Sequence, residues 1–506
     1  MAMSTVSVVH STTQPAPLWS TVGAKTEPIQ EVLLNDNGKP YSKSMQHHFS
    51  TESKDFSGSS LKKLATRLHG RKVIPLGTGR PTPDFYPWES LTVRGIVPHP
   101  LGSSATGVET ADYRVTKHGS TYNLSNGLNY GPTVGSPSLV RFLTEHVEIM
   151  HHPSYADWRV SLTSGSTAAL EIAFRIFCNR GDTVLAEQFT YPGAIEGAKL
   201  LGLAFEGVEM DVEGLRPAAL QRILREWDLS RGPKPRVLYT VPTGQNPTGA
   251  TQSTERRRAI YGIAEEHDLI IIEDDPYYFL RMGVYPPNQE STAKTPHLPS
   301  YLSLDRSGRV VRLDSAAKIL APGLRTGWVT ASAQIIEKFI AYQEITTVEV
   351  NGPSQLMLWS LLDQTWGHQG FSSWLDHISS AYRTRRDALL RACDQYLPRD
   401  ICAWDTPEYG MFLWLRLNWA RHPLLRSKLE AVEGEELLSE VAERINNNAI
   451  ENGVQVTKGL LFTPNQQPNG ELQFRLTFAA APAEEFERAV KALGDAVRQE
   501  FSVTCE

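Results

Sequence analysis

Lys318 lies in a segment whose composition suits a lysine that takes part in chemistry. The sequence reads Ser315-Ala-Ala-Lys318-Ile-Leu-Ala-Pro-Gly and continues to Arg325. Apolar surroundings and a nearby guanidinium both disfavour the ammonium form of lysine, so this amine can be neutral near about pH 7. A neutral amine can form a Schiff base with an aldehyde, while Ser315 and Arg325 offer what a phosphate needs. The natural cofactor for such a set is pyridoxal 5′-phosphate (PLP). A buried lysine paired with an acid would give the same local sequence.

A second candidate phosphate site follows Thr163, in TSGSTAALEIAFRIF. Ser166 and Thr167 precede an amphipathic helix, and either hydroxyl can cap it while free backbone N–H groups face outward. A helix N-terminus with small hydroxyl residues binds phosphate readily. The alternative is an ordinary N-cap without a ligand.

Two strand ends carry groups that suit a pyridine ring. In VPTGQNPTG, Asn246 precedes a proline and is therefore held in an extended conformation, from which its amide can reach a ring hydroxyl. In IIIEDDPYYF, consecutive acids follow a buried strand, and a buried carboxylate needs a cation such as a protonated pyridine nitrogen. We assign Asp275 to this nitrogen and expect Tyr278 to reach the same ligand. A plain Asn-Pro turn and a structural acid pair are the alternatives.

Arg475 is a lone guanidinium in the alternating segment QFRLTF. If its side chain faces inward, it can bind a substrate carboxylate in bidentate fashion. The alternative is an arginine that faces solvent.

The elements that must position these residues follow an alternating pattern. Apolar, β-branched runs at 184–188, 236–241, 269–274 and 310–314 are separated by helix-length segments such as 215–227 and 255–267. This pattern predicts a mostly parallel α/β sheet with helices on both faces, whose chemistry gathers at the carboxyl ends of the strands. Beyond about residue 351, strands at 411–417 and 472–480 and long helices predict a second, smaller α+β domain.

Composition narrows the class of function. The chain has 506 residues and a formal net charge of −6, which argues against nucleic acid or an anionic membrane as the main partner. Its four cysteines show no metal-type pairing, and no disulfide framework is implied. We expect a cytoplasmic protein without a membrane span, and a partly disordered arm over residues 1–60.

Taken together, the motifs resemble the PLP-dependent aminotransferases of fold type I, class I/II. The resemblance is strongest to fungal aromatic-amino-acid aminotransferases and kynurenine/α-aminoadipate aminotransferases. The matching stretches include GTGRPTPDFYP, LNYGPTVGSPSLVRFL, TSGSTAAL, PTGQNPTG, EDDPYYFL, DSAAKILAPGLRTGW and RLTFAAAP. The resemblance implies a large PLP-binding domain with a seven-stranded sheet over residues 111–350. It also implies a small domain over 351–506 and a segment over 61–110 that packs on the small domain and the active site.

The same resemblance implies a role for each motif residue. Lys318 would be the Schiff-base lysine and the proton shuttle, Asp275 would pair with the pyridine nitrogen, and Asn246 and Tyr278 would bind the ring oxygen. The residues implied at the phosphate and the ring face are Ser166, Thr167, Ser315, Arg325 and Tyr191. The residues implied at the substrate carboxylate are Arg475, Gly79 and Asn246. Tyr130, in LNYG, would reach the phosphate of the partner subunit, which implies a homodimer.

The expected reaction is transfer of the amino group of an aromatic or similarly bulky L-amino acid to 2-oxoglutarate. Phe85, Tyr86 and Trp88 could line an apolar pocket for the donor, or could serve only as packing. Aminoadipate or kynurenine as donor, and another PLP reaction such as a lyase, remain alternatives. A DNA-binding regulator on the same fold is a further alternative, disfavoured because residues 1–60 are too short and polar for a winged helix.

Overall fold

A computed structural model describes residues 38–67, 74, 76–77, 79–99, 109–119, 122–286, 297–425, 433–464 and 470–502. Within them, a seven-stranded sheet has the strand order β3-β11-β10-β9-β8-β4-β5. In chain order these strands are β3 (Trp158–Thr163), β4 (Thr183–Glu187), β5 (Ala204–Val208), β8 (Val237–Thr240), β9 (Ile270–Asp274), β10 (Val310–Ser315) and β11 (Gly327–Ser332). Only β11 runs antiparallel to its neighbours β10 and β3. The predicted mostly parallel sheet of seven strands is confirmed.

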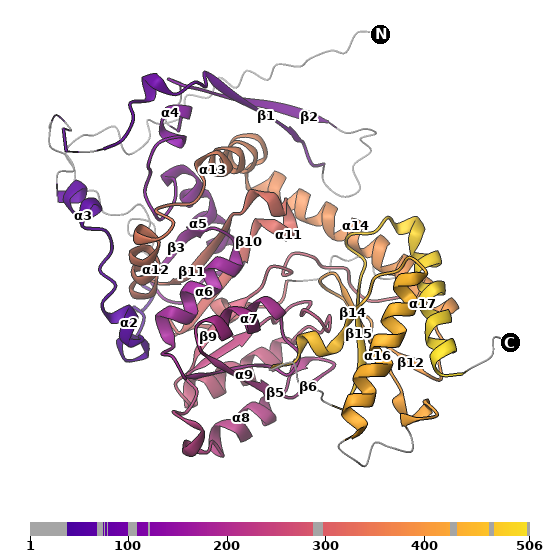
Figure 1. The fold of residues 1–506 in the computed structure, drawn as a ribbon. Coiled ribbons are helices and arrows are strands. Elements are labelled where there is room, and N and C mark those ends of the chain that lie inside the picture. Colours follow the sequence, from indigo (N-terminus) through magenta and orange to yellow (C-terminus); the bar gives the residue numbers. More distant parts are fainter. Residues whose placement is uncertain are drawn as a thin grey trace, which may run out of the picture.

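Helices flank this sheet, as the alternating sequence predicted (Figure 1). They are α5 (Pro137–His151), α6 (Ser166–Phe177), α7 (Pro192–Leu200), α8 (Pro217–Arg225), α9 (Thr254–Glu266) and α12 (Ala333–Ile345). Shorter elements between them are α4 (Leu124–Gly127), β6 (Met210–Asp211), β7 (Gly214–Leu215), α10 (Tyr301–Leu304), α11 (Ala316–Ile319) and η4 (Pro322–Leu324). All five residues of β9 are buried, because helices cover both faces of the central strands.

The C-terminal part forms a separate four-stranded antiparallel sheet of order β12-β13-β15-β14. Its strands are β12 (Cys402–Ala403), β13 (Phe412–Leu417), β14 (Thr457–Lys458) and β15 (Leu472–Thr477). The helices of this part are α14 (Gly367–Tyr396), α16 (Glu433–Glu451) and α17 (Phe486–Glu500), seen in orange and yellow in Figure 1. Before α14, the helix α13 (Gly352–Trp359) runs into a π-helical stretch, η5 (Ser360–Trp366). The domain boundaries predicted from the sequence stay predictions.

The N-terminal part contributes a hairpin and several short helices. The hairpin strands β1 (Ser90–Ile96) and β2 (Thr110–Thr116) pair antiparallel and lie against η5. The helices are η1 (Gln46–His48), α2 (Thr51–Lys54), α3 (Ser60–Arg67) and η2 (Pro83–Phe85). Of the predicted arm, residues 1–37 lie outside the described part. None of the helices described is both long and apolar enough to cross a membrane.

Candidate active site

Lys318 lies on α11, the short helix that directly follows β10. The helix begins at Ser315, whose Oγ accepts a hydrogen bond from the backbone N–H of Ala317 at 3.2 Å. Lys318 is half-buried. Burial is the main reason why the pKa of its amine lies below the ordinary value for lysine; Arg475 and Arg325 add to this effect, and Asp274 opposes it. The amine is thereby biased towards the neutral form that a nucleophile needs.

Arg325 stands at the N-terminus of α6. It follows η4 with a positive φ of 46°, and its Nη2 lies 3.4 Å from the carbonyl oxygen of Ser164. A Cβ at Gly165 would lie 2.7 Å from the same Nη2, and Gly165 itself has a φ of 90°. The glycine therefore lets the guanidinium approach the helix end closely.

The other predicted phosphate residues gather at the same place. Ser166 is half-buried and Thr167 is exposed in the first turn of α6. Ser315 pairs with Gly327 in the sheet, and a Cβ at Gly327 would lie 3.3 Å from Gly165. The structure thus brings three hydroxyls, a helix N-terminus and a guanidinium together, which is the donor set that a phosphate group requires.

Asp274 is the carboxylate that shares the environment of Lys318. It ends β9 and is buried, with its Oδ2 accepting a hydrogen bond from the Tyr239 hydroxyl at 2.9 Å. Its Oδ1 is also buried but makes no hydrogen bond. Burial, with a contribution from Asp275, raises the pKa of Asp274 to about 7, although Tyr239 and Lys318 oppose the rise. A buried acceptor without a donor fits the protonated nitrogen of a pyridine ring.

Asp275 and Tyr278, which the sequence predicted at the ring, have other partners in the structure. Asp275 Oδ2 accepts hydrogen bonds from Thr243 at 3.1 Å and from Arg312 at 3.2 Å. The Tyr278 hydroxyl donates to the carbonyl oxygen of Leu298 at 2.6 Å. Successive residues at a strand end point to opposite sides. Asp274 acts on Lys318 and Tyr277 on Asn246, so we propose Asp274 and Tyr277 for the roles predicted for Asp275 and Tyr278.

Tyr277, Asn246 and Arg475 form a second group of the site, and Tyr277 lies near enough to Asp274 to feel its charge. Arg475 Nη1 donates to Asn246 Oδ1 at 2.8 Å, and a hydrogen bond from Asn246 acts on the Tyr277 hydroxyl. The guanidinium of Arg475 is also flanked by the rings of Phe412 and Phe462, at 4.7 and 4.9 Å from the ring centroids. Arg475 is half-buried, and burial lowers its pKa while Tyr277 and Tyr191 oppose this. These contacts place Tyr191 in the same electrostatic environment.

Two predicted residues are not brought into this group. Gly79 is exposed, and no heavy atom would lie within 4 Å of a Cβ there. Tyr130 is 62% exposed. The aromatic residues considered for the donor pocket are also open to solvent, with Phe85 82% and Trp88 58% exposed.

Sequence reasoning missed Asp274, Tyr277 and the buried charge cluster behind them. Arg312 has no exposed surface and lies 3.1 Å from Glu273, 3.2 Å from Asp275 and 2.9 Å from Asp314. The doubled letters in EDDPYY offer two equally spaced Asp–Tyr pairs, so spacing alone could not choose between them. The available signal was Arg312, a cation in the neighbouring strand that needs an acid as its partner.

Comparison with known proteins identifies the family. The model of aminotransferase class I and II matches residues 114–493. The chain is 44% identical to aminotransferase swnA of Arthroderma benhamiae over 467 residues, which cover 90% of this chain and 92% of the relative. It is 37% identical to an aromatic amino acid aminotransferase of Schizosaccharomyces pombe over 475 residues, covering 91% and 98% of the two chains.

A solved structure agrees with this result. The crystal structure of aminotransferase Aro8 from Candida albicans has a TM-score of 0.83 and 33% sequence identity, and the match covers 92% of this chain and 100% of that chain. The chain therefore belongs to the class I and II aminotransferases and has the fold type I architecture. Membership of this family implies PLP as the cofactor, and the residues around Lys318 fit it.

Proposed function

We propose that the protein transfers the amino group of an aromatic L-amino acid to 2-oxoglutarate, with PLP held at Lys318. The observation that carries this proposal is the arrangement around Asp274, whose unused buried oxygen lies in the same electrostatic environment as a half-buried lysine with a lowered pKa. The Schizosaccharomyces pombe relative, named as an aromatic amino acid aminotransferase, supports the choice of donor.

Each group of the site has a definite task in this reaction. When bound, PLP supplies an electron sink for the charge that develops at the substrate Cα. Asp274 would accept a hydrogen bond from the protonated pyridine nitrogen and so keep that nitrogen protonated. Asn246 and Tyr277 would hold the ring oxygen. Ser166, Thr167, Ser315 and Arg325 would hold the phosphate through the N-terminus of α6.

The remaining residues act on the substrate. Arg475 would bind the α-carboxylate with its guanidinium fork, which fixes the direction of the Cα–H bond. The neutral amine of Lys318 would then take the proton from Cα of the amino acid. In the reverse half of the cycle, the same amine would give a proton to the corresponding carbon of the 2-oxo acid. Burial keeps both steps away from bulk water, and the same residues serve the 2-oxo acid in the reverse half of the cycle.

An aromatic cluster beside Arg475 supports an aromatic donor. Phe462 contacts the guanidinium, and its ring centroid lies 5.9 Å from that of Trp414. The Trp414 centroid in turn lies 5.2 Å from that of Phe189. The first contact is edge-to-face and the second is tilted, and an aromatic cluster of this kind favours a further aromatic ring. The pocket would thus be built by Phe189, Trp414 and Phe462 rather than by the residues preceding β1.

A panel of amino donors tests this proposal. Phenylalanine, tyrosine, tryptophan, 2-aminoadipate and kynurenine are each incubated with the purified protein and 2-oxoglutarate, and glutamate formation is followed. We expect the three aromatic donors to give the highest kcat/KM. A preference for 2-aminoadipate or kynurenine would replace the aromatic assignment, and sustained 2-oxo acid formation without any acceptor would indicate a lyase.

We also propose a homodimer in which Tyr130 binds the phosphate of the neighbouring active site. The exposure of several large apolar side chains in the N-terminal part supports a second chain that covers them. They are Leu61, Leu64, Ile74, Leu76, Phe85, Trp88 and Tyr130. Light scattering of the purified protein should give twice the chain mass of 56.3 kDa, and a monomer at working concentration would contradict the proposal.

A further inference from the structure

Two adjacent histidines of the N-terminal segment contact the large sheet far along the chain. The segment is fixed by backbone hydrogen bonds from Lys43 N to Ser307 O and from Met45 N to the Gln334 side chain, both 2.8 Å long. The helical turn η1 then carries His47 and His48 to Asp268, which lies between α9 and β9.

The three side chains present their ligand atoms at a spacing suited to a metal ion. His47 Nε2 lies 2.7 Å from Asp268 Oδ2, and His48 Nε2 lies 3.1 Å from Oδ1. One ligand atom from each residue lies within 4.8 Å of the others. Ligands of tetrahedral zinc bound at about 2.0–2.1 Å stand roughly 3.3 Å apart. Small rotations of the two rings would therefore bring all three atoms to one ion.

His48 is the independent observation that points to a ligand. Its side chain is only 3% exposed; Nδ1 has no hydrogen-bond partner, and Nε2 lies against the Asp268 carboxylate. A buried polar group in this state is rare in folded proteins and has an energetic cost.

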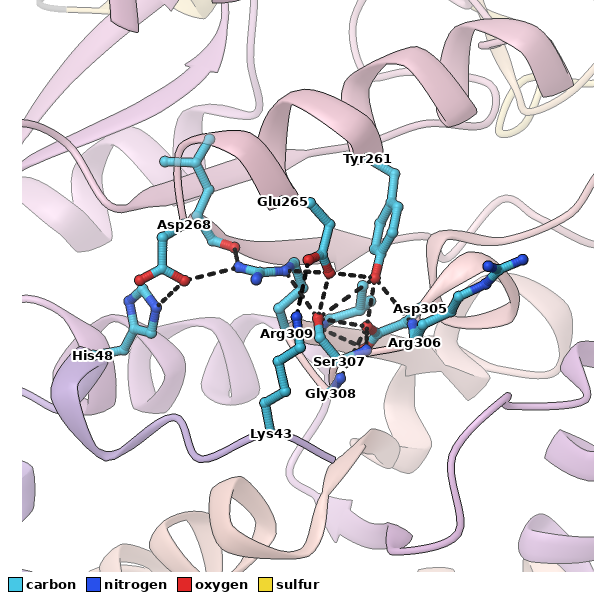
Figure 2. Close-up of polar contacts among 12 residues, drawn as sticks. Lys43, His48, Tyr261, Glu265, Asp268, Asp305, Arg306, Ser307, Gly308 and Arg309 are labelled. Carbon is cyan, nitrogen blue, oxygen red and sulfur yellow. Dashed lines mark hydrogen bonds and ion pairs between the residues drawn. The ribbon is translucent and has the colours of Figure 1, made fainter. Parts of the chain in front are cut away.

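Arg309 contacts the same oxygen of the Asp268 carboxylate as His48 does. Figure 2 shows the guanidinium and His48 reaching Asp268 from different sides. Arg309 Nη1 lies 3.3 Å from Asp268 Oδ1, while its Nε donates to Glu265 at 2.9 Å. Glu265 offsets the positive charge, and the second carboxylate oxygen, Oδ2, is contacted by His47 at 2.7 Å. Such partners behind a ligand fix its orientation and tune its affinity.

We propose that His47, His48 and Asp268 form a binding site for a divalent transition-metal ion, with zinc as the ion that fits best. Two imidazoles and one carboxylate suit zinc, whereas calcium and magnesium prefer oxygen ligands alone. Asp268 precedes β9, and Asp274 ends it, so the metal site lies at the opposite edge of the sheet from Lys318. The ion would fasten the N-terminal segment to the sheet and would take no part in amino transfer.

Calorimetric titration of the full-length, PLP-loaded protein without an affinity tag tests the proposal. With Zn²⁺ as the probe, we expect one site per chain and a binding-dependent rise of the thermal unfolding midpoint. His47→Ala and Asp268→Asn should each weaken Zn²⁺ binding roughly tenfold or more and abolish that rise. Mg²⁺ should produce neither effect, and the absorption of the bound cofactor should not change on adding Zn²⁺.

His152→Ala is the matched control. His152 also follows a buried histidine and lies 3.8 Å from a carboxylate, that of Glu148, so it resembles the proposed site without completing it. This variant should bind Zn²⁺ as the wild type does. His47 is 54% exposed, so its replacement leaves the core intact and the result interpretable. Absence of Zn²⁺ binding in the wild type, or unchanged binding in His47→Ala, would overturn the proposal.

Discussion

At the scale of the residue, the chemistry depends on which side of a strand end each acid occupies. Asp274 and Asp275 are neighbours in sequence, yet one faces Lys318 and the other faces the buried Arg312. Lys318, Arg475 and Asn246 could be found from the sequence because each stands in a distinctive motif. The choice between the two acids could not, because it depends on where β9 ends and on a charge supplied by β10.

The two acids should therefore respond differently to removal of their charge. Asp274→Asn should lower kcat roughly 100- to 1,000-fold because a neutral amide no longer holds the pyridine proton. Asp275→Asn should act on stability instead, since the buried Arg312 loses one of its three carboxylate partners, at a cost of about 1–3 kcal/mol, while Glu273 and Asp314 remain. Steady-state kinetics and thermal unfolding of both variants separate the two effects. Equal losses of kcat in the two variants would contradict the proposal that Asp274 alone contacts the pyridine nitrogen.

Arg475 makes its contribution through substrate binding. Arg475→Ala should raise KM for every amino donor by roughly 10- to 100-fold, because charge-assisted hydrogen bonds to the carboxylate are lost. Arg475→Lys keeps the positive charge but not the forked guanidinium, so its KM should lie between those of Arg475→Ala and the wild type. Measurement of KM for donors and for 2-oxoglutarate checks this. Unchanged values in Arg475→Ala would remove the carboxylate assignment.

At the scale of the element, the site depends on loops that follow the carboxyl ends of parallel strands. Alternating strands and helices were enough to predict the sheet, and hence the edge at which Lys318, Asn246 and the acids meet. The antiparallel strand β11 and the π-helical η5 had no comparable signal in the sequence. The close contact between the loop after β8 and the loop before β13 could not be predicted either, because it joins backbone segments far apart in the chain.

This contact can be tested at Gly410, just before β13. A Cβ there would lie 2.8 Å from the Cα of Gly244, in the loop that carries Asn246, and Gly410 has a φ of 82°. Gly453 has nearly the same φ, 80°, but no heavy atom within 4 Å of a Cβ.

Comparison of alanine variants isolates the contact between the two loops. Gly453→Ala should lower the free energy of unfolding only by the backbone cost of a positive φ in alanine, about 1–2 kcal/mol. Gly410→Ala should lower the free energy of unfolding by roughly a further 1–3 kcal/mol because of the clash. It should also lower activity, because the clash moves the loop that carries Asn246. Thermal unfolding and kinetics of both variants provide the measurement. Identical losses would show that the contact is unimportant.

At the scale of the whole molecule, the chain exposes several large side chains that the proposed homodimer would cover. Tyr130, Phe85 and Trp88 are largely exposed, and a Cβ added at Gly79 would have no heavy atom within 4 Å. The sequence implied the second chain through LNYG alone, by resemblance to a family, since no physical property of a single sequence states which surface meets a copy of itself. The overall fold, in contrast, followed from patterns within the chain.

Mixing two inactive variants tests whether active sites are shared. Lys318→Ala lacks the amine, and Tyr130→Ala lacks the hydroxyl proposed to reach the neighbouring phosphate. If each site takes Lys318 from one subunit and Tyr130 from the other, reassembled hybrids contain one intact site, and the mixture should recover roughly a quarter of the wild-type activity. Activity no greater than the sum of the separate variants would place both residues in the same subunit's site.

The proposed amino transfer depends most directly on the attachment of the cofactor to Lys318. Borohydride reduction of the PLP-loaded protein, followed by proteolysis and mass spectrometry, identifies the residue that carries the pyridoxyl group. We expect the label on the peptide that contains Lys318, and its loss, together with loss of turnover, in Lys318→Ala. A label on another lysine, or no label after incubation with PLP, would contradict the account.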